Sequence, residues 1–344
     1  MFISFLWQDS CLFLGMKNLI LNLQKITVLI VLLLATNAFA QDYSQVDLLV
    51  SSYPKSFSKA EDLAEKINKD FTKEDEKARA IFYWIASNIK YDVKTFYAQK
   101  NNRPVAFSFR TQEEKEAKQR QFKLDFALSA FKSKKAVCQG YTALFDHLSE
   151  LTGLESVTVT GTAKTNATQI GKLPGASDHA WNAVKINGHW KLVEPTWASG
   201  VVDPAKRTFT PKFNDGYFFT PPEIFVYTHF PDNKKWLLGE FTEQEFASYP
   251  LYFGEYIRDD YIILAPKSGI FTGKKYNTIA FKIKNLNSED QVTYALTRFR
   301  KLEMPELKVT GDTTEFNVVL PDNSNGYLTI YINNKGIASY KIQR

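Results

Sequence analysis

The chain has 344 residues and a formal net charge of +6, and 15% of its residues are aromatic. A chain of this length is expected to form about two domains, and its aromatic content is enough for two hydrophobic cores. Basic residues alternate with acidic ones and form no tract, so the sequence argues against a nucleic-acid partner and against binding to a charged membrane surface.

The first forty residues are typical of an export signal. Lys17 and Lys25 form a positive flank, residues 26–34 are an unbroken apolar run, and residues 38–40 give a small-x-small cleavage motif. The apolar run is shorter than the roughly 20 residues that a membrane span needs, so we expect no membrane span in the mature chain. We therefore predict that residues 1–40 are a signal peptide that is removed, and that the mature protein is periplasmic or secreted.

The cysteine count is informative once the signal is set aside. Cys11 lies in the predicted signal peptide, which leaves Cys138 as the single thiol of the mature chain and excludes an internal disulfide. A lone thiol in an oxidising compartment is either an inert buried side chain or a reactive group that is kept for chemistry. The count alone leaves both interpretations open.

Two helices are predicted at the start of the mature chain. A capping-box pattern at 58–61, followed by apolar residues at helical spacing, predicts a helix over about 59–70. An apolar stripe over 78–89 predicts a second, core-facing helix that ends near Lys90. Residues 111–123 are almost entirely polar and have no apolar period, so we interpret them as a solvated insertion and not as a binding surface.

A helix is predicted to begin at Cys138. Apolar residues recur every three or four positions from Tyr141 to Leu151, and Gly153 is a suitable C-terminal cap. An unperturbed thiol has a pKa near 8.5 and therefore contains little thiolate at neutral pH. A helix N-terminus favours the thiolate through its dipole, and its free backbone N–H groups can bind an oxyanion. Cys138 is therefore a candidate nucleophile that needs a base.

The base must be one of four histidines. His147 lies more than two turns along the same helix, and we interpret it, together with His189 and His229, as structural. His179 is distinguished by its register. Residues 156–163 alternate as a strand, and Asn187-Gly188 predicts a two-residue hairpin turn in which paired residue numbers sum to 375.

This register relates His179 to a carboxylate. Trp181 is predicted to lie opposite Glu194, and His179 is two residues from Trp181 on the same face, diagonal to Glu194. An imidazole and a carboxylate at this spacing can share a hydrogen bond that fixes the ring tautomer and supports an imidazolium. The sequence thus indicates Cys138, His179 and Glu194 as candidate catalytic residues.

The C-terminal part of the chain differs in composition. Short alternating strands, such as those at 279–283 and 328–332, are separated by Gly, Asn, Asp and Pro. We predict a domain over 41–245 that contains the candidate site, followed by a separate all-β, immunoglobulin-like sandwich over 246–344.

Several segments resemble the transglutaminase-like superfamily of papain-type thiol enzymes. The resemblance is strongest to the bacterial members and to the kyphoscoliosis peptidase branch of that superfamily. The resemblance spans about residues 50–240. It is carried by a lead-in helix at 77–85 with 89–92, by three central motifs at 137–141, 178–184 and 189–197, and by a trailing segment at 230–232 with 236–238. It implies an α+β fold with a papain/transglutaminase-like core, in which the helix carrying the cysteine packs on an antiparallel sheet. One position departs from the family's pattern, because Glu194 stands where the family has Asp before Pro-Thr-Trp.

The resemblance implies a thiol triad that acts on a carboxamide, with Cys138 as nucleophile, His179 as base and Glu194 as the orienting acid. The expected activity is that of an exported acyl-transfer enzyme that forms a thioester with peptide or glutamine-type amides, as a protease, amidase or transglutaminase. We expect protein or peptide substrates, with cell-wall peptide as a candidate. The sequence contains no metal-ligand spacing and no nucleotide-binding glycine loop, so no metal and no cofactor are expected.

A second hypothesis is that the chain keeps this fold without activity and serves as a peptide-binding or protein-binding scaffold. The two hypotheses differ in the reactivity that they assign to Cys138. The sequence gives no indication of oligomeric state.

Overall fold

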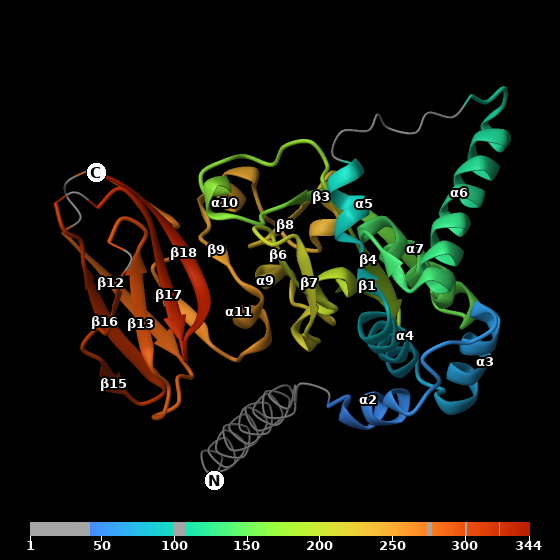
Figure 1. Cartoon of the computed structure of the whole chain (residues 1–344), viewed down its shortest axis with the longest axis horizontal. Helices are drawn as coiled ribbons and strands as arrows, with labels where there is room; N and C mark the ends of the chain where they lie inside the picture. The colour runs from blue at the N-terminus through green and yellow to red at the C-terminus, as the bar shows by residue number, and fades with distance from the viewer. Residues whose placement is uncertain (1–41, 100–107, 274–276, 300, 323) are drawn as a thin grey trace, which may run out of the picture. The chain divides into compact units, whose positions relative to one another are not determined.

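The structure is a computed structural model that describes residues 42–99, 108–273, 277–299, 301–322 and 324–344 (Figure 1). The predicted signal peptide, residues 1–40, lies outside the described residues. Residues Val46–Arg344 form one compact unit.

Helices form most of the first hundred described residues: α2 (Ser44–Ser51), α3 (Ala60–Asp70), α4 (Glu74–Asn88), α5 (Val93–Gln99), α6 (Gln112–Ser133) and α7 (Cys138–Leu151). The predicted helices over 59–70 and 78–89 correspond to α3 and α4. The capping box predicted at 58–61 lies one residue further along the chain: Lys59 is the N-cap of α3, and its backbone N–H donates to Asp62 Oδ2 at 3.1 Å.

The predicted solvated insertion contains the first half of a long helix, α6. Its start is capped by Thr111, whose hydroxyl accepts from the backbone N–H of Glu114 at 3.2 Å. Glu114 also forms a one-turn ion pair with Lys118 at 2.7 Å. Pairs of this kind and the high helix propensity of Glu, Lys, Gln and Arg stabilise a helix without an apolar stripe. Only the C-terminal half of α6 is anchored in the core, through Ala127, Ala130 and Phe131.

A four-stranded antiparallel sheet forms the centre of the N-terminal region, in the order β5-β4-β3-β8. Its strands are β3 (Ser156–Ala163), β4 (His179–Ile186), β5 (His189–Val193) and β8 (His229–Pro231). The register is the predicted one, since Asn182 pairs with Val193 and Ile186 pairs with His189. Helix α7 packs on β3 and β4, which confirms the expected α+β core in which the cysteine helix lies on an antiparallel sheet (Figure 1).

A buried polar cluster joins α7 to the sheet. Asp146 of α7 accepts hydrogen bonds from Ser156 and Thr158 of β3 at 2.6 Å each, and from Asn182 Nδ2 of β4 at 2.8 Å. Lys123 of α6 forms an ion pair with the same carboxylate. Because Asp146 is about two turns from Cys138, this cluster fixes the height and rotation of the cysteine helix over the strand that carries His179.

Several short elements complete the chain up to residue 258. They are β1 (Lys90–Tyr91) paired in parallel with β2 (Lys135–Ala136), η1 (Ala167–Gln169), α8 (Pro195–Ala198), the hairpin of β6 (Gly200–Asp203) and β7 (Thr208–Pro211), η2 (Asp215–Tyr217), α9 (Pro222–Phe225), η3 (Lys234–Leu237), α10 (Glu243–Ser248) and α11 (Gly254–Arg258). The predicted boundary between residues 245 and 246 falls inside α10, and the division into domains 41–245 and 246–344 stays a prediction.

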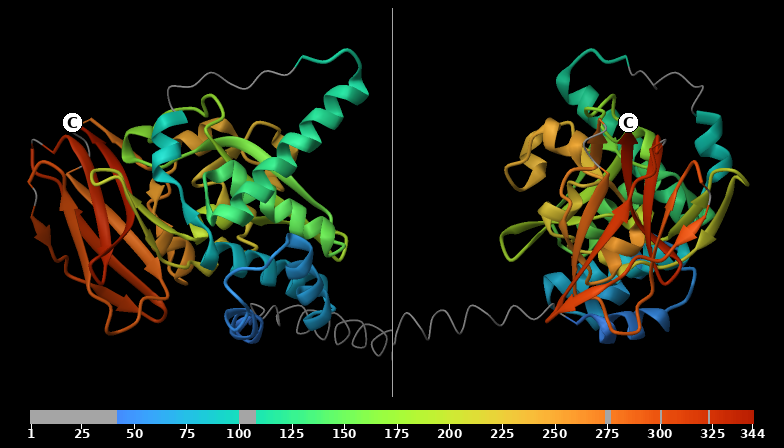
Figure 2. Two further views of the ribbon diagram at one scale, coloured as in Figure 1. Left: turned by 45° about the vertical axis from the view of Figure 1, so that its right-hand side comes forward. Right: turned by 90° about the vertical axis from the view of Figure 1, so that its left-hand side faces the viewer.

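The C-terminal region consists of two sheets with antiparallel pairing except between β11 and β18. The strands are β9 (Leu251–Tyr252), β10 (Ile262–Ala265), β11 (Ile270–Thr272), β12 (Thr278–Lys284), β13 (Val292–Leu296), β14 (Leu302–Glu303), β15 (Lys308–Thr310), β16 (Thr313–Val319), β17 (Gly326–Ile332) and β18 (Lys335–Gln343). One sheet has the order β10-β12-β16-β15. The other has the order β11-β18-β17-β13-β14, and β9 pairs with β18 in it. Figure 2 shows these strands in orange and red.

One apolar core is shared by the two C-terminal sheets. Phe281 of β12 stacks on Phe316 of β16, with ring centroids 5.0 Å apart, and meets the ring of Tyr340 of β18 edge-on at 5.2 Å. The predicted β-rich region is therefore present, while its assignment as immunoglobulin-like stays a prediction. Among the residues that the structure describes, no helix is both long enough and apolar enough to span a lipid bilayer.

Candidate active site

Cys138 is the first residue of α7. The chain reaches it in an extended conformation, because Ala136 pairs with Tyr91 and Val137 has φ −94° and ψ 178°. The turn then tightens at Gly140, where an added Cβ would lie 2.7 Å from the Cβ of Ala136. The Cys-Gln-Gly motif thus combines a helix start with the glycine that lets the preceding strand pass close to the first turn.

His179 begins β4 and meets Glu194 just beyond the end of β5. His179 Nε2 lies 2.8 Å from Glu194 Oε2, which is the hydrogen bond that the hairpin register predicted. The ring of His179 also packs near the ring of Trp197, at a centroid distance of 5.3 Å. A hydrogen bond and an aromatic contact together restrict the rotation of the imidazole.

Glu194 is fully buried and acts as the N-cap of α8. Its Oε1 accepts from the backbone N–H groups of Thr196 at 2.8 Å and Trp197 at 3.0 Å, while its Oε2 faces His179. Pro195 at the first helical position leaves no unused N–H and presets the helical φ. The Glu194 carboxylate therefore has two roles: one oxygen caps the helix, and the other orients the histidine.

The electrostatics favour a charged pair at this position. Burial raises the pKa of Glu194, but the charge and hydrogen bond of His179 and the nearby His229 outweigh burial and hold it below its usual value. Burial lowers the pKa of His179, and this effect is outweighed by the charge of Glu194 and by hydrogen bonds with Cys138 and Glu194, so that the pKa is raised. Because Nε2 is bound to Glu194, Nδ1 is the ring nitrogen that remains to face the thiol of Cys138.

The structure thus brings together all three candidates from the sequence. Cys138 is 5% exposed, and its Sγ also donates to Gln139 Oε1 at 3.4 Å.

Tyr91 lies near the thiol of Cys138. The burial of Tyr91, together with the nearby charges of Cys138, Tyr141 and Glu194, raises the pKa of the Tyr91 phenol. Tyr91 is therefore a neutral hydroxyl near the thiol at neutral pH.

The other histidines separate into two groups. His189 is exposed at the hairpin, where its Nδ1 lies 3.0 Å from the carbonyl oxygen of Asn187, and His147 lies in the middle of α7. His229 was interpreted as structural from the sequence, but it lies beside the acid, with Nε2 3.6 Å from Glu194 Oε2. The sequence contains no local signal for this proximity, because it depends on the long-range pairing of β8 with β3.

Comparisons with known proteins identify a family for part of the chain. Residues 61–195, which include Cys138, His179 and Glu194, match the family model of the transglutaminase-like superfamily. Residues 61–195 belong to that superfamily. The remaining part of the chain lies outside the matched range.

The transglutaminase-like segment has curated relatives in animals. The chain is 37% identical over 178 residues to mouse kyphoscoliosis peptidase, covering 52% of this chain and 23% of that protein. It is 34% identical over 199 residues to human kyphoscoliosis peptidase, covering 58% and 27% respectively. The match therefore spans about a quarter of the length of these relatives. Among solved structures, a crystal structure of a TGase matches 54% of this chain and 39% of that chain, at 19% identity and a TM-score of 0.29.

One group of side chains around Glu194 has the composition of a metal site. Ligand atoms of His179, Glu194 and His229 all lie within 4.8 Å of one another. Two ligands of a tetrahedral Zn²⁺ at about 2.0–2.1 Å are roughly 3.3 Å apart, whereas His179 Nε2 and Glu194 Oε2 are 2.8 Å apart. This shorter distance is that of a hydrogen bond between two groups that share a proton.

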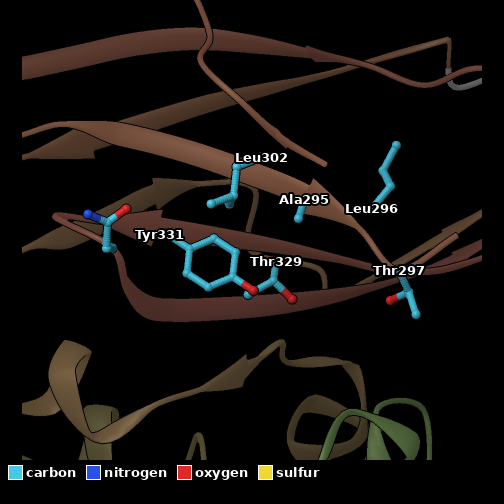
Figure 3. A pocket seen from close by; sticks show the side chains of 7 residues that line it. Ala295, Leu296, Thr297, Leu302, Thr329 and Tyr331 are labelled. Carbon is cyan, nitrogen blue, oxygen red and sulfur yellow. The ribbon is translucent and has the colours of Figure 1, made fainter. Parts of the chain in front are cut away.

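A hollow of about 420 Å³ lies elsewhere, on the C-terminal sheet that contains β13 and β17 (Figure 3). It is lined by Ala295, Leu296, Thr297, Leu302, Thr329, Tyr331 and Asn334. These residues do not include the three candidates of the transglutaminase-like segment, so the hollow is separate from the candidate active site.

Proposed function

We propose that the protein is a cysteine-dependent acyl-transfer enzyme. Cys138 is the nucleophile, His179 the general base and Glu194 the acid that orients the base. The observation that carries the proposal is the position of the His179 imidazole: its Nε2 lies 2.8 Å from the buried Glu194 carboxylate, and the ring is close enough to Cys138 for the thiol to contribute to its raised pKa. This is the order of groups that a thiol triad requires.

The reaction follows from these positions. His179 takes the proton of Cys138 and becomes an imidazolium beside Glu194, while the thiolate attacks the carbonyl carbon of a carboxamide. The oxyanion that forms is stabilised by backbone N–H groups at the start of α7. His179 then delivers its proton to the leaving amine, and a thioester remains on Cys138. Water or a second amine resolves the thioester, which gives hydrolysis or amine transfer.

The proposed substrates are proteins or peptides, with cell-wall peptide as a candidate. The name of the relatives, kyphoscoliosis peptidase, supports peptide amides as a substrate class, and the family resemblance of the sequence extends the proposal to glutamine-type amides. The test is mass spectrometry of the products from glutamine-containing peptides, with and without a primary amine. Shortened peptides indicate a peptidase, deamidated glutamine an amidase, and amine adducts a transglutaminase.

Thiol reactivity tests the catalytic assignment directly. We expect iodoacetamide to alkylate Cys138 rapidly at pH 6–7, because the imidazolium of His179 stabilises the thiolate. His179→Ala should slow this reaction sharply, and His189→Ala is the matched control because His189 is exposed at the hairpin. Equal and slow labelling of the wild type and His179→Ala would contradict the proposal.

The burial of Cys138 favours a second candidate, a peptide-binding or protein-binding scaffold that keeps the fold without turnover. A thiol that is 5% exposed must become accessible before a polymeric substrate reaches it. The same labelling experiment separates the two candidates, because a scaffold has no need of a reactive thiol.

Export is part of the proposal as well. The positive flank, apolar run and small-x-small motif within residues 1–40 support a periplasmic or secreted location. N-terminal analysis of the protein recovered from the producing cells tests this, since a mature chain that begins at Gln41 is expected. A cytoplasmic protein that retains residues 1–40 would contradict it.

A further inference from the structure

The imidazole of His229 lies beside the carboxylate oxygen that binds His179. Its Nε2 is 3.6 Å from Glu194 Oε2 and, within the described part of the chain, has no hydrogen-bond partner at a normal distance. The side chain is fully buried. A buried ring nitrogen without a partner costs free energy, so its orientation toward a carboxylate needs a physical reason.

The tautomer of His229 follows from its two neighbours. An ionised carboxylate only accepts hydrogen bonds, so the approach to Glu194 Oε2 is favourable only if Nε2 carries the proton. Nδ1 is then an acceptor, and Thr228 Oγ1, 3.0 Å away, is the hydroxyl that donates to it. Burial lowers the pKa of His229, and the carboxylate of Glu194 only partly offsets this, so the ring is neutral at neutral pH.

Aromatic rings fix the orientation of His229. The ring of Phe225 stacks on it at a centroid distance of 4.1 Å with an interplanar angle of 19°, and the ring of Trp197 lies at 4.4 Å. A small void that borders His229 is lined mostly by apolar side chains, such as Trp236 and Leu237, and has no room for a water molecule. The ring therefore has little freedom to rotate away from the acid.

The geometry points to His229 as a positioning residue: a neutral imidazole that donates from Nε2 to Glu194 Oε2 and holds the carboxylate in the orientation that His179 requires. The separation of 3.6 Å exceeds that of an ordinary N–H···O bond by about 0.6 Å, which a small rotation of either side chain closes. This inference rests on the proposed function, because it assigns His229 a role in the reactivity of Cys138.

The role is specific to the charged stage of the reaction. When His179 has taken the thiol proton, Glu194 faces an imidazolium and must remain ionised. With His229 donating as well, four N–H groups bind the two carboxylate oxygens: those of Thr196 and Trp197 on Oε1, and those of His179 and His229 on Oε2. The added donor makes Glu194 a weaker base, so the proton stays on His179 until the leaving amine takes it.

Two substitutions separate this role from packing. His229→Phe keeps an aromatic ring of similar size and removes both nitrogens, whereas His229→Gln places an amide N–H near the position of Nε2. The measurement is the rate of Cys138 alkylation by iodoacetamide from pH 5 to 9, with thermal unfolding as the check that each variant is folded. We expect His229→Phe to slow alkylation at pH 6–7 about tenfold, because a hydrogen bond to a buried charge is lost, and His229→Gln to recover most of the rate.

A folded His229→Phe variant whose pH profile matches the wild type would overturn the inference. If His179→Ala has no effect on alkylation, the proposed function itself is wrong; if His179→Ala slows alkylation and His229→Phe does not, only the role of His229 is wrong. Should His229→Phe fail to fold, nitrogen-15 spectra of the histidine rings in the wild type decide the matter. A neutral ring protonated on Nε2 at pH 7 is expected for residue 229, and a ring protonated on Nδ1 or on both nitrogens overturns the inference.

Discussion

Glu194 has several structural roles in the molecule. It is a fully buried carboxylate that caps α8, binds His179 and lies beside His229. The sequence predicted its contact with His179 because a two-residue turn fixes the register of a hairpin. It did not predict the helix cap, because Glu is not a preferred N-cap residue, nor the approach of His229.

Replacing Glu194 by Gln keeps the shape of the side chain and removes its charge. Because the pKa of Glu194 is lowered in the folded protein, its ionisation stabilises the fold above the unfolded value of 4.5, and this stability is lost as the pH falls through the folded value. We expect Glu194→Gln to be less stable than the wild type at pH 7, by about 3–5 kcal/mol if the partners stay unpaired. The difference in free energy of unfolding should shrink at pH 4 and below.

Urea unfolding at pH 7 and at the lowest pH where both proteins fold measures this effect. Glu150→Gln is the matched control, since Glu150 is an exposed residue of α7. A destabilisation of Glu194→Gln that is equal at both pH values would show that the charge of Glu194 contributes nothing to the fold.

At the scale of elements, local signals decided what the sequence could predict. The start of α7 and the hairpin of β4 and β5 were predicted because a cysteine-glycine helix start and an Asn-Gly turn act within a few residues. Strand β8 was not predicted, since it has three residues and pairs with a strand more than sixty residues earlier in the chain. Helix α6 was missed as a helix because a solvated helix lacks the apolar period that identifies one.

Gly140 tests the packing at the start of the cysteine helix. Alanine has a higher helix propensity than glycine by about 1 kcal/mol, so an unhindered Gly140→Ala substitution would stabilise α7. Here the new Cβ would lie 2.7 Å from the Cβ of Ala136 and 3.4 Å from that of Ala130. We expect the clash to outweigh the propensity and to lower the stability by about 1–3 kcal/mol, as overpacking of a core does.

Thermal unfolding measures the effect of Gly140→Ala against Gly175→Ala, a control at a loop position where an added Cβ meets nothing within 4 Å. The alkylation rate of Cys138 should fall as well, because the first turn of α7 moves. A Gly140→Ala protein that is more stable than the wild type would mean that helix propensity dominates at this position.

The cluster around Asp146 tests how α7 is held on the sheet. Asp146→Ala removes the acceptor of Ser156, Thr158 and Asn182 in a buried environment. We expect a loss of about 3 kcal/mol or more, because buried donors lose a charged acceptor. Lys123→Ala should cost much less, since the Lys123 side chain is 42% exposed and remains solvated. Equal effects of the two substitutions in urea unfolding would contradict this account of the cluster.

At the scale of the whole molecule, the sequence located the change from the transglutaminase-like region to the β-rich region, because short alternating strands separated by Gly, Asn, Asp and Pro begin there. Residues just after the predicted boundary pack in the core of the region before it. Helix α10 spans the predicted boundary, and Phe246 packs with Val226, Phe230 and Leu237 on the N-terminal side of it. Composition reports the change of secondary structure but not which side chains complete a core.

Lys164 strengthens this junction. It is 1% exposed at the end of β3, and its Nζ donates to the carbonyl oxygens of Phe246 at 2.6 Å and Tyr249 at 2.9 Å. A chain of residues 42–250 keeps both acceptors and the ring of Phe246, whereas a chain of residues 42–245 loses all three. The amine of Lys164, whose pKa is lowered by burial to about 7, then lacks both hydrogen-bond acceptors. We expect the longer chain to unfold cooperatively on heating and the shorter chain to be destabilised by several kcal/mol, because a core phenylalanine and the hydrogen-bond acceptors of a polar side chain are lost together. Circular dichroism melting curves compare the two, and Lys164→Met in the shorter chain should restore part of the lost stability, since it removes the amine that has lost its acceptors. If the two chains melt at the same temperature, residues 246–250 are a linker and the boundary predicted from the sequence is correct as it stands.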